Sequence, residues 1–572
     1  MLYNQIIGEI KEQIEKAAGE TVRADELKES TAADIACTIS FRLAGKLRKS
    51  PKEIAENLAS KIESTGRIKK VEAVNGYLNF FIDYSLVLSP LLEEIRSKGK
   101  EFGRGVPMEK KIVLEHTSIN PSGPLHIGRL RNCLIGDSLG RILAFSGYTL
   151  ETHYFVNDVG KQIAIIARGF AEGLEPDADA VKNYSDYADK EDFLVFFTYV
   201  SANRRFEEDA AFAARVQEHI KKAEGGDSSA LDEITAVAKR CLAGQKQIYD
   251  LLDIKFDFFD YESAYIRNGS VTRVIEHVSK SPLARRSDKG FGLDLSGYGL
   301  ERRDSATILE RADGTSVYLS RDIAYHLEKL ERGDIIMNVL GEDHKNEFKE
   351  LTTILMEFFG VKKPMEAVHY SFVSFEGIEL STRKGQTAPV DKLIDEAVTK
   401  AAEEIEKRGI ASKEVAPVIA IGAIKYHILK TSPQKMMSFR WEDALSFEGD
   451  SAPYIQYAHA RSCSILEKAG ADIAGIDISG IDLCLEKGEE NLVKVLMRFP
   501  DVVAKAASER KPSNVASYVY ELASSYSRFY KECQVISTEK RVMDRRLLLV
   551  DSTRQVLENG LRLLGIDAPR RM

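Results

Sequence analysis

The spacing of apolar residues predicts a small α/β unit at the N-terminal end of the chain. Two segments repeat apolar residues at helical spacing, and a third has strand character. The helical sets are Ile6, Ile7, Ile10 and Ile14, then Ile35, Ile39, Leu43 and Leu47, and the strand is expected at 76–82. The charged, glycine-containing segment 98–105 is typical of a linker and predicts a boundary near residue 105.

The middle of the chain alternates apolar runs with helical segments, which is typical of a parallel sheet covered by helices. A strand at 112–114 leads through a proline- and glycine-containing loop into a helix. The apolar residues of that helix are Leu130, Leu134, Ile135, Leu139, Ile142 and Leu143. Further strands are expected at 150–156, 316–319 and 335–340. Residues from about 165 to 310 are strongly charged with helical patterning, so we expect an insertion between two halves of one sheet.

From about residue 395 the pattern is almost purely helical. The expected fold class is therefore α/β, with a Rossmann-type parallel-sheet domain at 106–395, an N-terminal α/β domain at 1–105 and a C-terminal all-α domain at 396–572. The net charge of −8 argues weakly against nucleic acid, but residues 511–572 carry 11 Lys and Arg against 7 Asp and Glu, a balance of +4. A basic module is compatible with RNA binding, although a solvated helical face would look the same.

The composition predicts an ordinary soluble globular protein, with 44% hydrophobic and 29% charged residues. We expect no membrane segment, because no apolar run approaches spanning length and the first residues lack a signal pattern. The six cysteines are scattered without a Cys-x-x-Cys pair, which argues against a zinc site or disulfide framework and for a reducing, cytoplasmic location.

The stretch from Glu115 to Asn132 carries the strongest chemical signal. A strand, a Gly/Pro loop and a helix start together form a phosphate-binding architecture, in which free backbone N–H groups and the positive end of the helix dipole face the loop. Gly128 would let a nucleotide approach the backbone, and His126 would place a hydrogen-bond donor beside phosphate charge. A strand, a loop and a helix are common in α/β proteins, so His-x-Gly alone would not decide the matter.

The whole stretch resembles the HIGH signature of class I aminoacyl-tRNA synthetases, in the version carried by arginyl-tRNA synthetases. The fourth HIGH position is Arg129 rather than His. Arginine can bind phosphate bidentately but cannot exchange protons. The resemblance covers essentially the whole chain and is weakest in the insertion.

The resemblance implies an ATP-dependent ligase that makes arginyl-adenylate and then esterifies the 3′ end of tRNA(Arg). Mg²⁺ would accompany ATP and be held mainly by its phosphates, with no dedicated protein metal site. It also implies a D-loop-contacting domain at 1–105, a class I catalytic domain at 106–395 and a helical anticodon-binding domain at 396–572. We expect the chain to act as a monomer.

The segment 313–324 resembles the part of these synthetases that binds the arginine side chain, and it contributes Tyr318 and Asp322. A guanidinium offers five N–H donors in a planar fork, so its pocket needs carboxylates and hydroxyls at fixed angles. The resemblance also assigns Glu115 and Asn120 to the arginine pocket. The alternative is that Tyr318 is core and Asp322 is a helix N-cap.

The segment 375–386 resembles the family's counterpart of KMSKS, a loop whose cations steady the leaving pyrophosphate. By register Thr382 replaces the second lysine. Some members place a compensating lysine before the HIGH motif, where this chain has Gly123. The positive charge is then expected from Arg129, Arg383 or Lys384. An ordinary exposed hairpin is the alternative.

The resemblance further implies contacts to ATP and to tRNA. The ATP-binding residues would be Ser118, Pro121, Gly123, His126, Gly128, Asp343, His344, Ser381 and Thr382. The segment 341–345, which supplies Asp343 and His344, matches only loosely and would equally suit a surface turn. Aromatics interleaved with cations suit single-stranded RNA, although helix packing also explains each aromatic taken alone. The tRNA-binding residues would be Tyr77, Asn79, Tyr454, Tyr457, Arg461, Arg528 and Tyr530.

Two other functions stay open on the sequence. The first is a class I synthetase for another amino acid. Glu115 and Asp322 in one pocket argue against most such synthetases, because two carboxylates favour a cationic substrate. The second is a non-catalytic RNA-binding relative that has lost activity through Arg129 and the reduced KMSKS segment. The retained pocket residues argue against this second reading.

Overall fold

The computed structural model describes residues 2–30, 32–64, 66–300, 306–375, 388–409 and 412–572. The N-terminal unit packs helices against a four-stranded antiparallel sheet in the order β1-β2-β4-β3. Its elements are α1 (Leu2–Ala18), β1 (Leu27–Glu29), β2 (Ile35–Cys37), α2 (Ile39–Leu47), α3 (Pro51–Ala59), β3 (Ile68–Val74), β4 (Tyr77–Ile82) and α4 (Tyr84–Lys98). The expected helix from Ile35 is wrong at its start, because Ile35 pairs with Phe80 in the sheet and the helix begins at Ile39.

The central sheet has five parallel strands in the order β12-β11-β5-β6-β7. These strands are β5 (Lys111–Glu115), β6 (Thr149–Val156), β7 (Phe258–Tyr261), β11 (Ile335–Gly341) and β12 (Met365–Tyr370). The expected α/β fold class is confirmed. The chain leaves β5 to one side and later returns on the other, so β5 and β11 flank the topological switch point. In such sheets ligands bind in the crevice outside the carboxyl ends of these strands.

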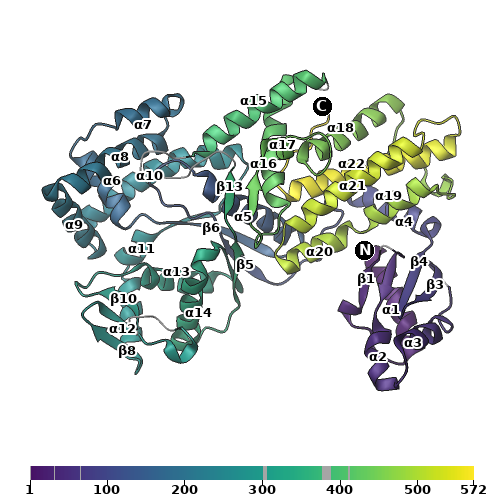
Figure 1. The fold of residues 1–572 in the computed structure, drawn as a ribbon, viewed down its shortest axis with the longest axis horizontal. Coiled ribbons are helices and arrows are strands. Elements are labelled where there is room, and N and C mark those ends of the chain that lie inside the picture. Colours follow the sequence, from purple (N-terminus) through teal and green to yellow (C-terminus); the bar gives the residue numbers. More distant parts are fainter. Residues whose placement is uncertain (1, 31, 65, 301–305, 376–387, 410–411) are drawn as a thin grey trace.

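Helices cover this sheet (Figure 1). They are α5 (Ile127–Phe145), α13 (Tyr318–Arg332) and α14 (Lys345–Phe359), and α5 and α13 among them carry candidate site residues. Nearly every residue of α5 is buried, because the helix lies between the sheet and the C-terminal helices. The expected strand at 316–319 is wrong: Ser316 makes a single bridge to Glu310, and α13 begins at Tyr318.

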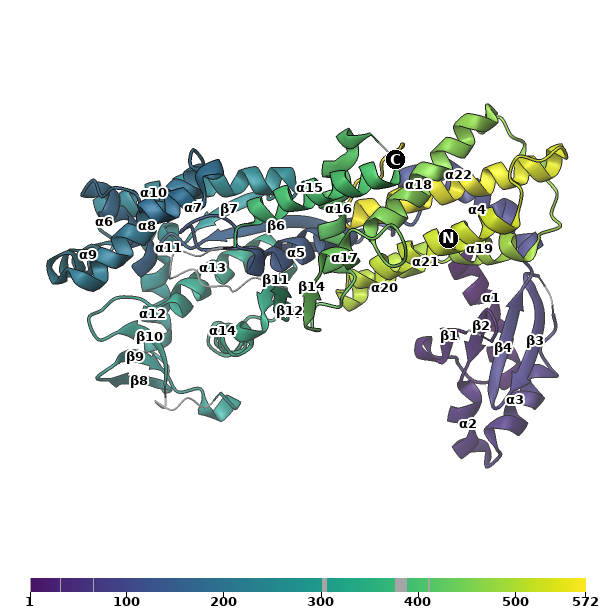
Figure 2. The ribbon, with the colours of Figure 1, turned by 45° about the horizontal axis from the view of Figure 1, so that its top comes forward.

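The segment between β6 and α13 contains two parts of different structure. The first is a helical group, seen at the left end of Figure 2, formed by α6 (Lys161–Ala171), α7 (Ala178–Asn183), α8 (Glu191–Glu208), α9 (Ala210–Glu224) and α10 (Ser228–Leu251). The second comprises α11 (Glu262–Arg267), α12 (Ser270–Ser279) and the antiparallel strands β8 (Ala284–Ser287), β9 (Gly290–Leu293) and β10 (Thr307–Arg311). Between them β7 returns to the central sheet as an edge strand.

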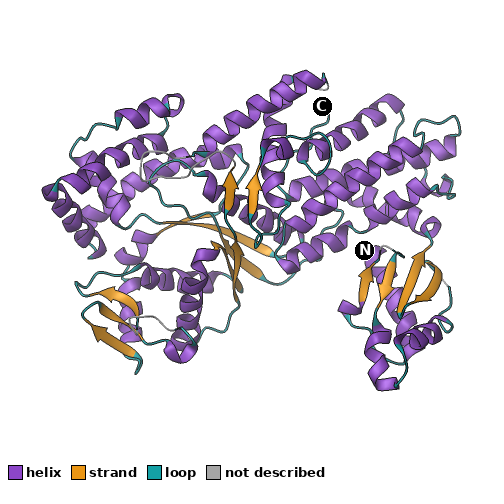
Figure 3. Ribbon diagram, viewed as in Figure 1, coloured by secondary structure: helices purple, strands orange, loops and turns teal. Residues whose placement is uncertain are grey.

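The C-terminal part is almost entirely helical (Figure 3). Its helices are α15 (Val390–Arg408), α16 (Ala416–Leu429), α17 (Trp441–Ala444), α18 (Ala452–Ala469), α19 (Lys487–Met497), α20 (Phe499–Glu509), α21 (Ser513–Glu532) and α22 (Lys540–Leu563). One short parallel pair, β13 (Val373–Phe375) with β14 (Met437–Phe439), joins it to the part that contains the central sheet. The expected boundary at 395/396 falls inside α15. In the described part of the chain, no helix has the length and apolar character needed to cross a membrane.

Candidate active site

His126 caps the helix that starts at the switch point. Its Nδ1 accepts a hydrogen bond from the Gly128 N–H at 3.0 Å. The proton of the neutral ring therefore lies on Nε2, which is buried and has no hydrogen-bond partner among the described residues. Burial and the nearby Arg129 guanidinium lower the pKa of His126 below its usual value. The ring is thus a neutral donor aimed away from its own helix.

The first backbone N–H groups of α5 are not free, contrary to the expectation from sequence. The Ile127 N–H donates to Ala388 O at 2.9 Å, and the Gly128 and Arg129 N–H groups donate to His126. The helix end is thus closed by its own cap and by residues 388–390. An anion here would meet the dipole, the His126 donor and the exposed Arg129 side chain. No hydrogen bond or ion pair holds the Arg129 side chain to another described residue.

The loop between β5 and α5 is held in a strained shape. Thr117 and Ser118 have φ of 71° and 45°, a left-handed conformation that non-glycine residues rarely adopt. The Thr117 N–H donates to Asn132 Oδ1 at 2.8 Å, and Asn132 Nδ2 donates to Val339 O at 3.0 Å. The Asn132 amide therefore ties the loop to β11 across the switch point.

Two further loop positions expected to bind ATP, Pro121 and Gly123, differ in their surroundings. Pro121 lines a cavity between the loop and the start of α6. Gly123 is buried, where an added Cβ would stand 3.0 Å from Phe196 Cβ of α8, and its carbonyl accepts a hydrogen bond from Gln245 at 2.8 Å. Gly123 therefore anchors the loop to the insertion and does not line this cavity, and its contact with ATP stays a prediction.

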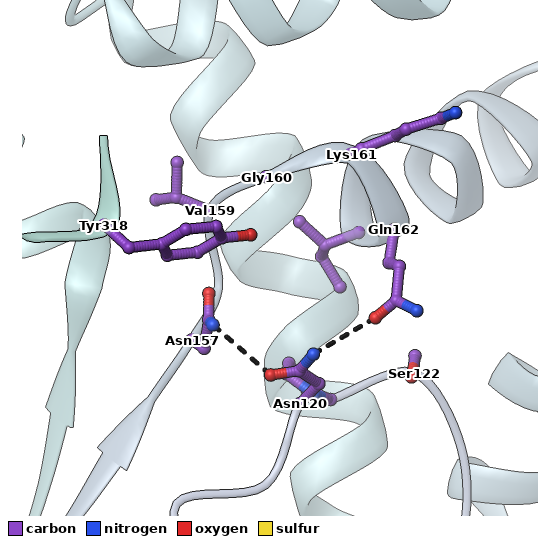
Figure 4. A pocket seen from close by; sticks show the side chains of 10 residues that line it. Asn120, Ser122, Asn157, Val159, Gly160, Lys161, Gln162 and Tyr318 are labelled. Carbon is purple, nitrogen blue, oxygen red and sulfur yellow. Dashed lines mark hydrogen bonds between the residues drawn. The ribbon is translucent and has the colours of Figure 1, made fainter. Parts of the chain in front are cut away.

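A cavity of about 190 Å³ opens where the loop meets the start of α6 and α13 (Figure 4). Its polar lining includes Asn120, Asn157, Gln162 and Tyr318. Asn120 Nδ2 donates to Gln162 Oε1 at 3.1 Å, and the Asn120 and Asn157 amides lie 3.2 Å apart. Gly160 has φ of 128°, and a Cβ there would stand 2.8 Å from the Tyr318 hydroxyl. A glycine at this position keeps the cavity open.

Asp322 is not the N-cap of its helix. Val317 holds that position, and Asp322 lies one turn inside α13 on the same face as Tyr318. The Arg321 guanidinium lies 4.9 Å from the Tyr318 ring centre and pairs with Glu262 at 2.5 Å. Burial and the neighbouring Glu115 carboxylate raise the pKa of Asp322 to about 7. Its side chain is still 44% exposed, so a cation can reach it.

Glu115 is committed to partners within the protein. Its Oε2 accepts hydrogen bonds from Lys329 Nζ at 2.6 Å and from Asn338 Nδ2 at 3.0 Å. Its Oε1 accepts the Ser118 hydroxyl at 3.0 Å, and Ser118 Oγ in turn accepts the Phe155 N–H at 3.1 Å. Glu115 and Ser118 thus support the loop and do not line the cavity.

Of the two other segments expected near the nucleotide, the structure describes the one at 341–345 but not the one at 376–386. Asp343 and His344 form a turn directly after β11, where Asp343 is exposed and His344 is half-buried. A hydrogen bond with Glu347 raises the pKa of His344. Residues Ser381, Thr382, Arg383 and Lys384 lie outside the described residues. The described residues that flank them are tied to the site, because Val390 N donates to Leu125 O at 2.8 Å.

The N-terminal candidates differ in exposure. Tyr77 is 42% exposed, and its ring packs edge-on against the exposed Phe41 ring at 5.0 Å. Asn79 is only 6% exposed, because it is paired with Ala36 and Glu72 on either side in the sheet. Tyr77 and Phe41 present an aromatic pair to solvent, whereas the Asn79 side chain is buried; that either candidate contacts a base stays a prediction.

Three of the C-terminal candidates form one surface group. The Arg461 guanidinium lies 4.6 Å from the Tyr457 ring centre and 5.2 Å from that of Tyr530, so α18 and α21 together present two aromatic rings around a cation. Arg528 is exposed on α21. Tyr454 is half-buried, and its hydroxyl donates to Ser527 Oγ at 3.1 Å, which places it in the helix packing.

Sequence reasoning missed the residues that only topology brings to the site. Asn157 and Gln162 follow β6, and Asn338 and Lys329 come from β11 and α13. Asn157 directly follows a predicted strand, and the carboxyl ends of parallel strands share one edge, so its position was an available signal. Among the described residues, no group of three or more His, Cys, Asp or Glu side chains is placed to hold a metal ion.

Comparisons with known proteins agree with this architecture. Three family models match consecutive parts of the chain: "Arginyl tRNA synthetase N terminal domain" at residues 4–82, "tRNA synthetases class I (R), catalytic domain" at 91–441 and "DALR anticodon binding domain" at 455–572. The arginine--tRNA ligase of Methanocaldococcus jannaschii is 41% identical over 100% of this chain and 99% of its own length.

Two further matches extend the likeness. The arginine--tRNA ligase of Methanothermobacter thermautotrophicus is 42% identical over 96% of this chain and 95% of its own length. The solved structure of Thermus thermophilus arginyl-tRNA synthetase superposes with a TM-score of 0.80 at 27% identity, over 98% of this chain and 99% of that one. The chain belongs to the class I arginyl-tRNA synthetase family.

Proposed function

We propose that the protein is an arginine–tRNA ligase, which uses ATP to activate L-arginine and transfers it to the 3′ end of tRNA(Arg). The observation that carries this is the polar cavity at the switch point, which Asn120, Asn157, Gln162 and Tyr318 line, together with the Asp322 carboxylate one turn after Tyr318 in α13. Amides and a hydroxyl suit the amino and carboxylate groups of an amino acid, and a carboxylate suits a guanidinium.

The chemistry needs no protein nucleophile. A carboxylate oxygen of arginine attacks the α-phosphorus of ATP, the bond to pyrophosphate breaks, and a tRNA ribose hydroxyl then attacks the adenylate carbonyl and releases AMP. Rate comes from holding the reactants in line and from donors placed where charge develops. The neutral His126 ring, with its unpartnered Nε2–H, supplies such a donor, and Arg129 supplies a cation.

The site assignments divide by substrate. Arginine is bound by Asn120, Tyr318 and Asp322. ATP lies against the loop and α5, with Pro121, His126, Arg129, Asp343 and His344 nearby and Mg²⁺ on its phosphates. Arg383 and Lys384 would add positive charge at the pyrophosphate.

The tRNA contacts fall at two separate surfaces. Tyr77, on the 1–105 unit, meets the D-loop, and Tyr457, Arg461, Arg528 and Tyr530 meet the anticodon loop. We expect the chain to act as a monomer, and its six unbridged cysteines suit a reducing cytoplasm.

The direct test of activation is exchange of labelled pyrophosphate into ATP. The purified chain is assayed with each of the twenty amino acids, with and without tRNA(Arg). We expect pyrophosphate exchange with arginine and with none of the other amino acids. Exchange with another amino acid would favour a synthetase of different specificity, and no exchange under any condition, with a folded protein that binds tRNA, would favour a non-catalytic RNA-binding relative.

A further inference from the structure

A chain of three side-chain amides connects the insertion to the loop before α5. Asn157, Asn120 and Gln162 lie in a row along the cavity, with 3.2 Å between the first two amides and 3.1 Å between the last two (Figure 4). An amide carries a donor N–H₂ group and an acceptor oxygen of nearly the same size. Each link joins one nitrogen to one oxygen, so the whole chain can run in either of two directions at the same distances.

Two acceptors next to Asn157 select one of these directions. In Figure 4 the Asn157 nitrogen faces Asn120, which leaves the Asn157 oxygen against the Val159 carbonyl and the Glu262 carboxylate. Neither of these two groups has a hydrogen to donate. With the amide turned, the Asn157 nitrogen donates to Val159 O at 3.0 Å and to Glu262 Oε2 at 2.6 Å, and the Asn157 oxygen accepts from Asn120 at 3.2 Å.

Glu262 is held as an acceptor by Arg321. Glu262 is 1% exposed at the start of α11, and its Oε1 accepts a hydrogen bond at 2.5 Å from Nε of the fully buried Arg321. Burial raises the pKa of Glu262 to about 7, and the Arg321 guanidinium opposes that shift. At pH 8 the carboxylate is ionised, and the oxygen that faces Asn157 can only accept. A buried ion pair therefore decides which way round the Asn157 amide lies.

The direction passes along the chain to Asn120. Because the Asn157 oxygen accepts, Asn120 gives an N–H to Asn157, and its own oxygen accepts from the Gln162 amide. Asn120 keeps one further N–H on the Asn157 side and one further lone pair on the Gln162 side. An α-amino acid carries a carboxylate that accepts and an ammonium group that donates. An amide held in one direction can bind both groups, whereas a reversed amide sets donor against donor and acceptor against acceptor.

We propose that Glu262 is a positioning residue for amino-acid recognition: through Asn157 it holds the Asn120 amide in the one direction that pairs with both the α-carboxylate and the α-ammonium group of the substrate. This inference rests on the proposed function, in which Asn120 binds arginine. Glu262 does not line the cavity, so it acts through the amides. The insertion thus takes part in recognising the end of the amino acid that becomes activated.

The experiment measures dissociation constants by isothermal titration calorimetry on the full chain at pH 8. L-Arginine carries both α groups, agmatine lacks the carboxylate, and 5-guanidinopentanoate lacks the ammonium group. Glu262→Gln is the test, because its oxygen stays on the Arg321 guanidinium and its N–H₂ group then meets the Asn157 donor. Glu224→Gln is the matched control, because Glu224 is also a buried partner of Arg321, at 3.5 Å, but its other ion pair is with Arg311.

Glu262→Gln is expected to weaken L-arginine binding about tenfold and to weaken agmatine and 5-guanidinopentanoate binding less than about threefold. Each analogue offers a single α group, which the Asn120 amide can bind in either direction, whereas the intact amino acid requires one direction. A general loss of packing would weaken all three ligands alike. Glu224→Gln is expected to bind all three as the wild type does. The unfolding midpoint establishes that each variant is folded.

Asn157→Leu decides the matter if Glu262→Gln does not fold. It cuts the same link at a half-buried position and keeps the pair between Glu262 and Arg321, so the same pattern of ligand affinities is expected. Unchanged L-arginine binding by the folded variant, or equal losses for all three ligands, would overturn the inference. The same pattern in Glu224→Gln would overturn it as well, since the charge on Arg321 would then be the cause. A wild-type chain that binds no arginine would instead overturn the proposed function, and the inference with it.

Discussion

Replacing Asp322 by Asn should weaken arginine binding while stabilising the empty protein. The substitution removes one charge and keeps the size of the side chain. A hydrogen bond to a charged group contributes about 1.5–3 kcal/mol when shielded, and an exposed ion pair contributes less than about 1 kcal/mol. Because Asp322 is 44% exposed in the empty pocket but is covered once arginine is bound, we expect about 1.5–3 kcal/mol, which is a ten- to hundredfold rise in the dissociation constant.

The stability change has the opposite sign. Burial and Glu115 raise the pKa of Asp322 from 3.8 to about 7. Because the folded pKa lies above the unfolded one, the stabilising contribution of this group is complete below about pH 4 and is lost as pH rises through 7. Such a displacement corresponds to about 4 kcal/mol for a fully buried group, and the exposure of the side chain reduces it to about 1–2 kcal/mol. Asp322→Asn removes that cost at pH 8.

Two measurements follow these effects. Calorimetric titration gives the arginine dissociation constant, and thermal unfolding without arginine gives the stability at pH 4 and pH 8. In the wild type, arginine affinity should rise as pH increases through about 7, because the guanidinium pairs with the ionised carboxylate, and in Asp322→Asn it should be flat. Glu331→Gln, an exposed carboxylate on the same helix, is the control for losing a charge from α13.

A folded Asp322→Asn variant that binds arginine as tightly as the wild type would refute the reasoning. A variant less stable than wild type at pH 8 would also contradict it, because the carboxylate would then be held by favourable partners and not by an open pocket.

Three further changes test other parts of the molecule. His126→Ala should lower kcat for adenylate formation about 10²–10³-fold in pyrophosphate exchange, the size expected for one lost transition-state donor, and an unchanged kcat would remove His126 from the chemistry. Arg461→Ala should raise the KM for tRNA(Arg) about tenfold and leave arginine activation unchanged, since it removes the cation between Tyr457 and Tyr530; an equal effect on both reactions would point to misfolding. Glu489→Gln should cost about 3–5 kcal/mol of stability in denaturant unfolding, because this fully buried carboxylate pairs with Arg545 and Arg546; a loss below about 1 kcal/mol would show that the pairs contribute little.

The sequence predicted best where one element buries a continuous apolar run. The strands expected at 112–114, 150–156 and 335–340 are present with small changes at their ends, because each is central in the sheet and covered on both faces. The sequence pattern did not predict β7, because β7 is a short edge strand inside a charged segment. Residues 316–319 have β-branched and aromatic side chains that suit a strand, but tertiary packing starts a helix at Tyr318.

Residues of the candidate site could be predicted only where they lie close together in the sequence, within one motif. Asn120 and Pro121 lie in the loop that leads to His126 and line the cavity, whereas Gln162 and Lys329 come from other elements. A buried lysine has no sequence signal, because lysine is rarely buried without a partner and the partner lies far away in the chain. The capped start of α5 could not be foreseen either, since the Ile127 N–H is taken by Ala388.

The most direct measurement of the central claim is aminoacylation of tRNA(Arg) with labelled arginine, ATP and Mg²⁺. The account predicts acid-precipitable arginine on the tRNA 3′ end, dependence on ATP, and loss of the product with Asp322→Asn at limiting arginine. Charging of tRNA(Arg) with a different amino acid, or no charging by a folded chain that binds both arginine and tRNA, would contradict it.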